Sequence, residues 1–175
     1  GSIPSSIGNL SKISSILLSS NNLSGLIPSE IGDLPLLNSL NVSNNQATGA
    51  NNNSLSGIIP NSFCNIANGN LNFDNNNFCD PYPSCIDAID IGTQDTGSCL
   101  SCPSGQISPD NISCYSETDL NVLIAFAQNS GLSEEYVDVI TMGTQTWNGD
   151  GRLTFLGCNN CGLSGSIPSS IGNLE

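Results

Sequence analysis

A short block, Gly-x-Ile-Pro, recurs along this chain and constrains its fold more than any other feature. The block begins at Gly1, Gly25, Gly57 and Gly165, so the first two steps are 24 and 32 residues. Apolar residues between the blocks follow the one-letter pattern LxxLxLxxNxL, at Ile13, Ile16, Leu18, Asn21 and Leu23 and again at Leu37, Leu40, Val42, Asn45 and Ala47. This spacing is typical of a solenoid, because one coil buries its apolar face only against its neighbours.

Each copy of the pattern predicts a short strand, a tight bend and a return segment. Ile16 and Leu18 alternate along a strand, so both side chains point inward onto the next coil. The Asn amide turns inward and binds the backbone of the bend, which predicts a ladder of Asn21, Asn45 and Asn76. Pro and Gly in the IPxxIG stretch favour a narrow return without strands.

Two segments, LSSNNLSGLIPSEIGDLPLL and GLSGSIPSSIGNL, carry a family resemblance. They resemble the plant-type, 24-residue class of extracellular leucine-rich repeat, found in receptor ectodomains and polygalacturonase inhibitors. The resemblance implies an α/β repeat fold, a right-handed leucine-rich-repeat solenoid with short parallel strands, disulfide-bonded caps and a small helical N-terminal cap. The outward strand positions, where ligand-binding members of the family make their contacts, are here small and polar apart from the first: Leu17, Asn41, Asn72 and Gly157.

A third copy of the pattern is weaker and leads into a cysteine-rich loop. It reads Leu71, Phe73, Asn76 and Phe78, but its first apolar position falls on Asn68. The loop from Cys79 to Cys85 looks like a C-terminal cap, with Cys64 available to tie into it. We interpret the eight extra residues 50–57 as a surface bulge, because Asn and Ser contribute little to a core.

The second half of the chain begins without a repeat. From Ile86 to Cys114 the sequence is rich in Asp, Ser, Gly and Thr, which is typical of a linker. A helix is then predicted with Leu120, Leu123, Ile124 and Ala127 on one face, Ser116 or Thr118 as its cap and Gly131 as its end. A second short helix is predicted from Ser133, and two strand-like runs around Asn148-Gly-Asp150-Gly predict a hairpin.

This helix and hairpin, with Trp147, resemble the N-terminal cap of plant-type leucine-rich repeat proteins. Residues 1–10 and 165–174 also share one sequence, GSIPSSIGNL, at an offset of 164. We therefore expect tandem modules: repeats and a C-terminal cap in 1–85, a cysteine-containing linker in 86–114, the next N-terminal cap in 115–152 and its first repeat in 153–175. The alternative is a single domain with a loose coil at each end.

Eight cysteines without any His point to four disulfides formed in an oxidising compartment. The cysteines are Cys64, Cys79, Cys85, Cys99, Cys102, Cys114, Cys158 and Cys161, and their pairing stays open. A zinc site built from the two Cys-x-x-Cys pairs is the rival interpretation. In the second repeat, Cys158 replaces an inward Leu and Cys161 the ladder Asn, so we expect them to bridge to each other or to the cap.

Five Asn-x-Ser sequons predict N-linked glycans and an extracellular or cell-surface location, at Asn9, Asn22, Asn41, Asn52 and Asn111. No apolar run is long enough to cross a membrane, and we expect a signal segment ahead of Gly1.

The charge composition excludes several classes of partner. Fifteen acidic residues against only Lys12 and Arg152 give a net charge of −13. Nucleic acid is therefore not an expected partner, because phosphate binding needs a basic patch, and anionic membranes would repel the chain.

No catalytic residue, metal or cofactor is assigned, because without His the usual Ser-His and Cys-His pairs are missing. The paired acids Glu134 and Glu135, and Asp87 and Asp90, are better explained as solvated residues than as a glycosidase pair. We considered structural calcium at the Asn148-Gly-Asp150-Gly turn, but a hairpin explains that turn and the EF-hand register is absent.

Our first hypothesis is a structural role, in which tandem capped modules of about 164 residues form an extended, glycosylated extracellular fibre through self-association or covalent succession. The alternative is a recognition module, a receptor ectodomain or an inhibitor of a wall-degrading enzyme, that binds protein or glycan partners on its concave strands. Ice or mineral binding is a third hypothesis, although no regular Thr ladder supports it.

Overall fold

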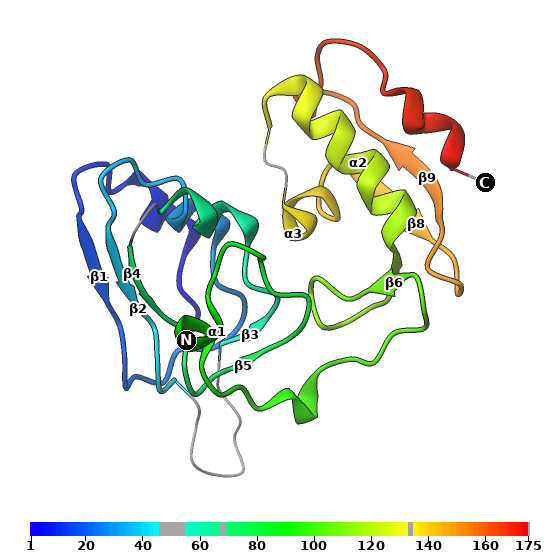
Figure 1. Cartoon of the computed structure of the whole chain (residues 1–175). Coiled ribbons are helices and arrows are strands. Elements are labelled where there is room, and N and C mark those ends of the chain that lie inside the picture. The colour runs from blue at the N-terminus through cyan, green and yellow to red at the C-terminus, as the bar shows by residue number, and fades with distance from the viewer. Residues whose placement is uncertain (46–54, 67–68, 133–134, 175) are drawn as a thin grey trace. The chain divides into compact units, whose positions relative to one another are not determined.

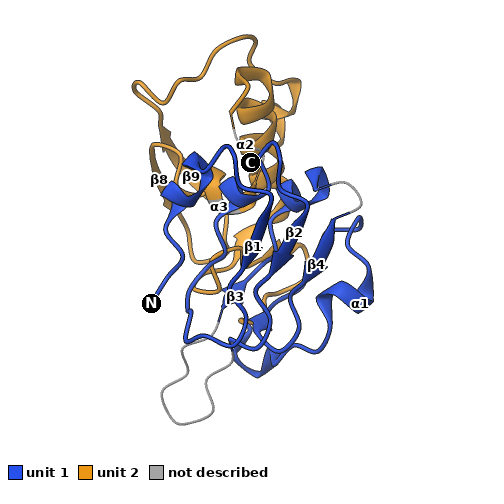
Figure 2. Cartoon of the chain, turned by 90° about the vertical axis from the view of Figure 1, so that its left-hand side faces the viewer, with its two compact units in different colours: residues 1–99 blue, residues 100–175 orange. Residues whose placement is uncertain are grey.

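The computed structural model describes residues 1–45, 55–66, 69–132 and 135–174. The chain forms two compact units, Gly1–Cys99 and Leu100–Glu175, which are coloured separately in Figure 2. Each unit has its own core of buried apolar side chains. We describe the two units one after the other.

The first unit is organised by a parallel three-stranded sheet (Figure 1). Its strands are β1 (Ser15–Leu17), β2 (Ser39–Asn41) and β4 (Asn70–Asn72), in that order. Ser15 pairs with Ser39, and Ser39 pairs with Asn70, so the repeat step is 24 and then 31 residues. The middle residue of each strand points inward, and Ile16 and Leu40 are buried as the alternation predicts.

The return segments are built from 3-10 helices that follow prolines. The helices η1 (Ser5–Asn9), η2 (Ser29–Ile31) and η3 (Asn61–Asn65) begin directly after Pro4, Pro28 and Pro60. Proline suits this position because its ring fixes φ near the helical value and its missing N–H would have no partner in the first turn. Gly25 and Gly57, at φ 80° and 78°, take a left-handed conformation that disfavours other residues.

The expectation of a strandless return is wrong for the residues just before these helices. β3 (Ser56–Gly57) and β5 (Asn77–Phe78) form a second parallel pair, and Gly25 bridges to Leu55 beside it. The surface-bulge interpretation fails at the same place, because Leu55 is fully buried and Ser56–Gly57 is a strand. Residues 50–54, the rest of that predicted bulge, lie outside the described residues.

The core of the first unit runs from Ile3 to Ile91 and includes three aromatic rings. Phe63, Phe73 and Phe78 pack edge to face, with ring centroids 5.6 and 5.9 Å apart. Their position near the end of the repeat explains how the weaker third copy of the pattern still buries an apolar face, since aromatic rings fill more volume than Leu. Asn68, its doubtful first position, lies outside the described residues.

The ladder asparagines close the bends after the strands. The buried Asn45 amide donates to the carbonyls of Val42 (2.7 Å) and Leu18 (3.1 Å). Its Oδ1 accepts from the backbone N–H groups of Asn21 (3.1 Å) and Leu23 (3.3 Å). One side chain therefore satisfies backbone groups of its own coil and of the preceding coil.

Asn76 and Asn21 occupy the same position in their coils. The Asn76 amide donates to Phe73 O at 2.8 Å and to Val42 O at 3.0 Å, so it also joins two coils. The more exposed Asn21 donates to Leu18 O and Ser19 O within its own coil.

Replacing Asn45 by Ala should lower the free energy of unfolding of the first unit by about 3 kcal/mol, because several buried backbone groups lose their partner. The matched change Asn21→Ala, on an exposed side chain, should cost less than about 1 kcal/mol. Urea unfolding followed by circular dichroism measures both. Equal effects of the two substitutions would contradict the ladder role of Asn45.

Residues 86–99, which we expected to open the linker, belong to the first unit. The helix α1 (Ala88–Ile91) follows the capping loop, and backbone hydrogen bonds join Phe73 N to Asp90 O and Asn75 N to Thr93 O, both at 2.8 Å. The short helix η4 (Thr96–Ser98) ends at Cys99, the last residue of the unit. This segment supplies the next partner for the coil that contains β4.

The second unit contains the predicted helix and hairpin. It comprises β6 (Gln106–Ile107), β7 (Tyr115–Ser116), α2 (Glu117–Ser130), α3 (Tyr136–Val139), β8 (Thr144–Trp147), β9 (Leu153–Gly157) and η5 (Ser169–Asn173). β6 and β7 pair antiparallel, as do β8 and β9. The Ser116 side chain caps α2 by accepting from Asp119 N, and Gly131 ends it in the left-handed conformation, as predicted.

The core of the second unit lies along one face of α2. Leu120, Leu123 and Ala127 are buried there with Val139 of α3, and Ile124 packs against them. The predicted start of the second helix at Ser133 falls outside the described residues, and α3 begins at Tyr136.

Candidate interaction surfaces

The outward face of the three-stranded sheet is small and polar. Leu17 is 68 % exposed, whereas Asn41 and Asn72 are half-buried. The Oδ1 atoms of Asn41 and Asn72 accept from the backbone N–H two residues further on, at 3.0 and 3.1 Å. Gly157, the fourth residue predicted for this face, lies instead in β9, which pairs with β8 of the second unit.

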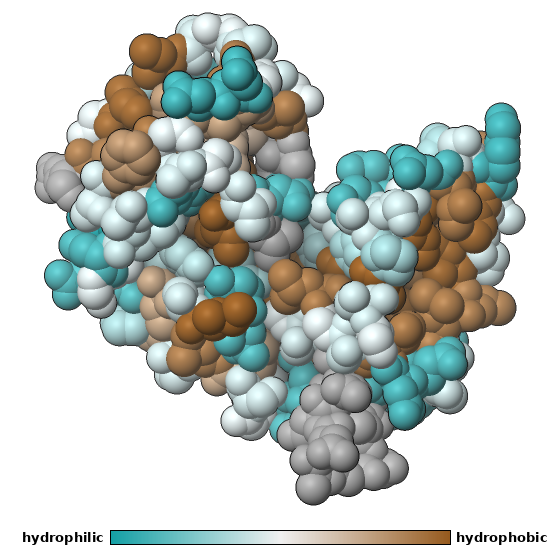
Figure 3. Space-filling model, turned by 180° about the vertical axis from the view of Figure 1, so that it is seen from behind, coloured by the Kyte–Doolittle hydropathy of each residue, from teal (hydrophilic) through white to brown (hydrophobic). Residues whose placement is uncertain are grey.

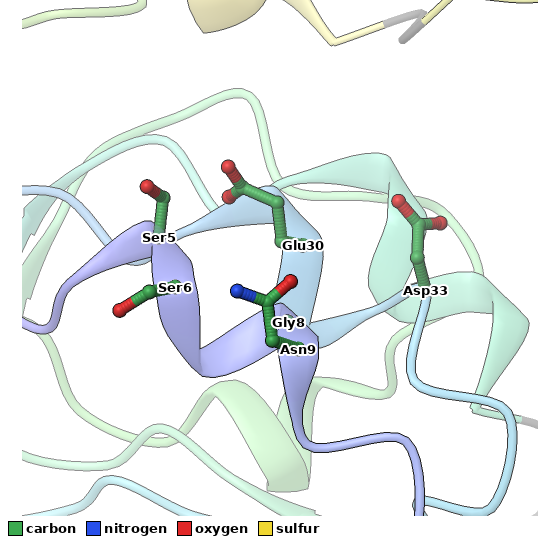
Figure 4. Close-up of a pocket in the computed structure, with 6 residues that line it drawn as sticks. All are labelled: Ser5, Ser6, Gly8, Asn9, Glu30 and Asp33. Carbon is green, nitrogen blue, oxygen red and sulfur yellow. The ribbon is translucent and has the colours of Figure 1, made fainter.

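A shallow groove lies on the opposite edge of the repeats, between η1 and η2. It has a volume of about 480 Å³ and is lined by Ser5, Ser6, Gly8, Asn9, Glu30 and Asp33. Figure 4 shows the Ser5 hydroxyl and the Glu30 carboxylate projecting to the same side. The lining is hydroxyl, amide and carboxylate, so the groove offers hydrogen bonds and negative charge.

The sequons differ in their accessibility. Asn9 and Asn22 are exposed, whereas Asn41 and Asn111 are half-buried. Asn111 Oδ1 accepts from Leu100 N at 2.6 Å, and Asn41 Oδ1 also accepts from the Ser43 hydroxyl at 2.8 Å. Asn52 lies outside the described residues. Attachment of glycans stays a prediction, for which Asn9 and Asn22 have the more open surroundings.

All eight cysteines are paired. The disulfides join Cys64 to Cys85, Cys79 to Cys99, Cys102 to Cys114 and Cys158 to Cys161. Cys99 and Cys102, which form one arm of the rival zinc interpretation, pair with different partners. Four disulfides fit an extracellular or secreted protein.

The Cys158–Cys161 disulfide stands where a ladder hydrogen bond stands in the first unit. There, Asn21 Nδ2 donates to the carbonyl of Leu18, three residues earlier, at 3.1 Å. Cys161 and Cys158 occupy the corresponding positions, and Asn160 has the positive φ that Ser20 has in the first coil. A covalent bond thus spans the same bend that an Asn amide closes elsewhere.

The double change Cys158→Leu with Cys161→Asn should therefore keep the second unit within about 1 kcal/mol of the parent stability, because the Asn amide restores a net hydrogen bond. The control, Cys158→Ala with Cys161→Ala, should lose about 2 kcal/mol, as expected for opening a short disulfide loop. Thermal unfolding under non-reducing conditions compares them. If the Leu/Asn variant is no more stable than the Ala/Ala variant, the equivalence is wrong.

One buried ion pair in the second unit was not predicted. The Arg152 guanidinium donates to both carboxylate oxygens of Asp119, at 2.8 and 2.9 Å, and Asp119 Oδ2 also accepts from Leu153 N. The Asp119 side chain is 1 % exposed. This bidentate pair fixes the start of β9 to the first turn of α2.

The candidate acids of the second half and of the cap do not form a pair. Asp87 is the residue before α1, and the side chain of Asp90 is half-buried one turn later. Glu135 is buried at the start of α3, whereas Glu134 lies outside the described residues.

An aromatic pair packs at the base of the hairpin. The rings of Tyr115 and Trp147 meet edge to face, with centroids 4.9 Å apart. The Tyr115 hydroxyl donates to Asp110 Oδ2 at 2.8 Å. Burial first, and then this hydrogen bond and the Asp110 charge, raise the pKa of Tyr115 to about 12.

The raised pKa of Tyr115 predicts a pH dependence. Unfolded Tyr ionises near pH 10, so the stability that comes from the neutral phenol is complete below that pH and is lost as the pH rises toward about 12. Subtracting the 295 nm absorbance titration of Tyr115→Phe from that of the parent should give a step well above pH 10. Asp110→Asn should lower the midpoint, and a parent step at the ordinary value would refute the assignment.

Comparison with known families identifies repeats in both units. The Leucine Rich Repeat family model matches residues 12–34 and 152–174. The first match contains β1 and the second contains β9, so a repeat strand lies in each unit. No curated protein matches the chain. Leucine-rich repeats are typical of protein-interaction modules, because their stacked strands form extended surfaces.

In the described part of the chain, no helix combines the length and apolar character that crossing a membrane requires.

Proposed function

We propose that this chain is a structural, glycosylated extracellular protein built from plant-type leucine-rich-repeat solenoid modules in series, which carry no catalytic activity. Its partners are further modules of the same kind, which follow one another into an extended fibre. The chain as a whole binds neither nucleic acid nor a cofactor in this proposal.

The observation that carries the proposal is the distribution of repeats over the two units. The matches at 12–34 and 152–174 fall in separate compact units, and the sequence GSIPSSIGNL stands at 1–10 and again at 165–174. One set of repeats therefore ends, with residues 86–99 and two disulfides over its last coil, before another begins. Such an order suits modules joined end to end.

The small outward face of the sheet supports a structural role over ligand recognition. Binding hot spots are enriched in Trp, Tyr and Arg, whereas the outward strand positions are Ser, Asn and Leu. The disulfides fit an extracellular location, and the exposed Asn9 and Asn22 suit attached glycans.

Chains with one, two and three copies of residues 1–164 ahead of residues 165–175 should become longer in regular steps. Four stacked strands span about 20 Å at sheet spacing, so each period should add at least about that length. Small-angle X-ray scattering measures the maximum dimension, and electron microscopy the rise.

Two results would count against this proposal. Periods that collapse into a globule would not lengthen regularly. Alternatively, a single-period chain that captures a peptide or enzyme, and loses it on Asn41→Tyr or Asn72→Tyr but not on exposed Ser104→Tyr, would favour recognition on the sheet.

A further inference from the structure

The same ten residues occupy two different environments in this protein. In the first copy, residues 1–10, Ile3 is 6 % exposed; in the second, residues 165–174, its equivalent Ile167 is 72 % exposed. Apolar side chains of the second unit, including Phe155 and Ile171, are exposed near it, and hydrophobic patches are visible on that unit in Figure 3. The second copy therefore lacks the cover that the first copy has.

The cover of the first copy is the coil at residues 25–34. Ile3 shares a core cluster with the fully buried Ile27 and Ile31. A Cβ added at Gly8 would lie 2.6 Å from Glu30 Cβ, so this glycine allows η1 and η2 to touch. Figure 4 shows the two segments side by side. Around Gly172, the equivalent of Gly8, the described residues leave open space.

Two strand edges complete the same picture. β1 has β2 on one side only, and β9 pairs with β8 only, among the described strands. The two family matches align β9 with β1, so Leu156 corresponds to Ile16. A parallel β9–β1 pair would continue the register by which β1 already pairs with β2.

The charge pattern leaves these two ends neutral. None of the fifteen acidic residues falls in 1–29 or in 151–174, although the chain carries a net charge of −13. Lys12 adds a positive charge to the first of these segments. Like-charge repulsion between copies is therefore weakest where these ends meet.

We propose that residues 165–174 of one copy take the place of residues 1–10 on the 25–34 coil of a second copy, so that chains associate head to tail. β9 of the first copy then pairs in parallel with β1 of the second, and Ile167 packs where Ile3 packs. This contact rests on the proposed function, because it is the noncovalent form of the same succession of modules.

One substitution, made in each copy of the ten residues, tests the exchange with opposite expected signs. Gly172→Ala should weaken association at least about tenfold, the factor that corresponds to 1.4 kcal/mol, because the added Cβ meets Glu30 of the second copy. Gly8→Ala should strengthen association, because it loosens the chain's own residues 1–10 from that coil. Gly149→Ala, also in open space, is the control that changes nothing.

Sedimentation of the full chain over a wide concentration range measures the association, and thermal melting confirms that Gly172→Ala leaves the monomer folded. Association that is insensitive to Gly172→Ala would overturn the exchange and leave the proposed function intact. A chain that stays monomeric even as Gly8→Ala would overturn it as well. The scattering of covalently joined periods decides the proposed function separately.

Discussion

The fold of the first unit depends on how each tight bend satisfies its backbone. A coil of this size turns too sharply for its own N–H and C=O groups to pair with one another, and unpaired groups are costly once buried. Asn45 solves this for two coils at once, since it accepts from Asn21 N and Leu23 N and donates to Leu18 O and Val42 O. Stacking is thus a condition for closing the bend and not only for burying apolar surface.

The same requirement is met by different chemistry elsewhere in the chain. Beyond Asn76, the Gln94 side chain donates to Phe73 O at 3.0 Å and accepts from Phe78 N at 3.1 Å. In the second unit the Cys158–Cys161 disulfide spans the bend. These substitutions explain why the chain tolerates departures from the repeat pattern at the places where one set of coils ends and another begins.

Much of the fold could be predicted from the sequence, because its signals are local. The inward Ile16 and Leu40, the Ser116 cap and the Gly131 end follow from spacing and residue type. Leu55 was misjudged because its Asn and Ser neighbours resemble a loop, whereas a parallel bridge to Gly25 draws it into the core.

The features that escaped prediction are those that join distant residues. Asp119 and Arg152 are 33 residues apart, and the sequence marks Asp119 only as an ordinary acid in the first turn of a helix. Gln94 similarly carries no repeat signal, so its role over the last coil emerges only from the hydrogen bonds that it makes. The outward sheet positions were predicted from the period alone, except for Gly157, which the hairpin claims.

The Asp119–Arg152 pair also bears on durability outside a cell. Trypsin-like proteases read a basic side chain in an acidic specificity pocket, and this chain offers them only Lys12 and Arg152. The Arg152 guanidinium is already held by a carboxylate, and its side chain is only 31 % exposed. A digestive enzyme of that class therefore finds a single open cutting site, Lys12, in the native protein.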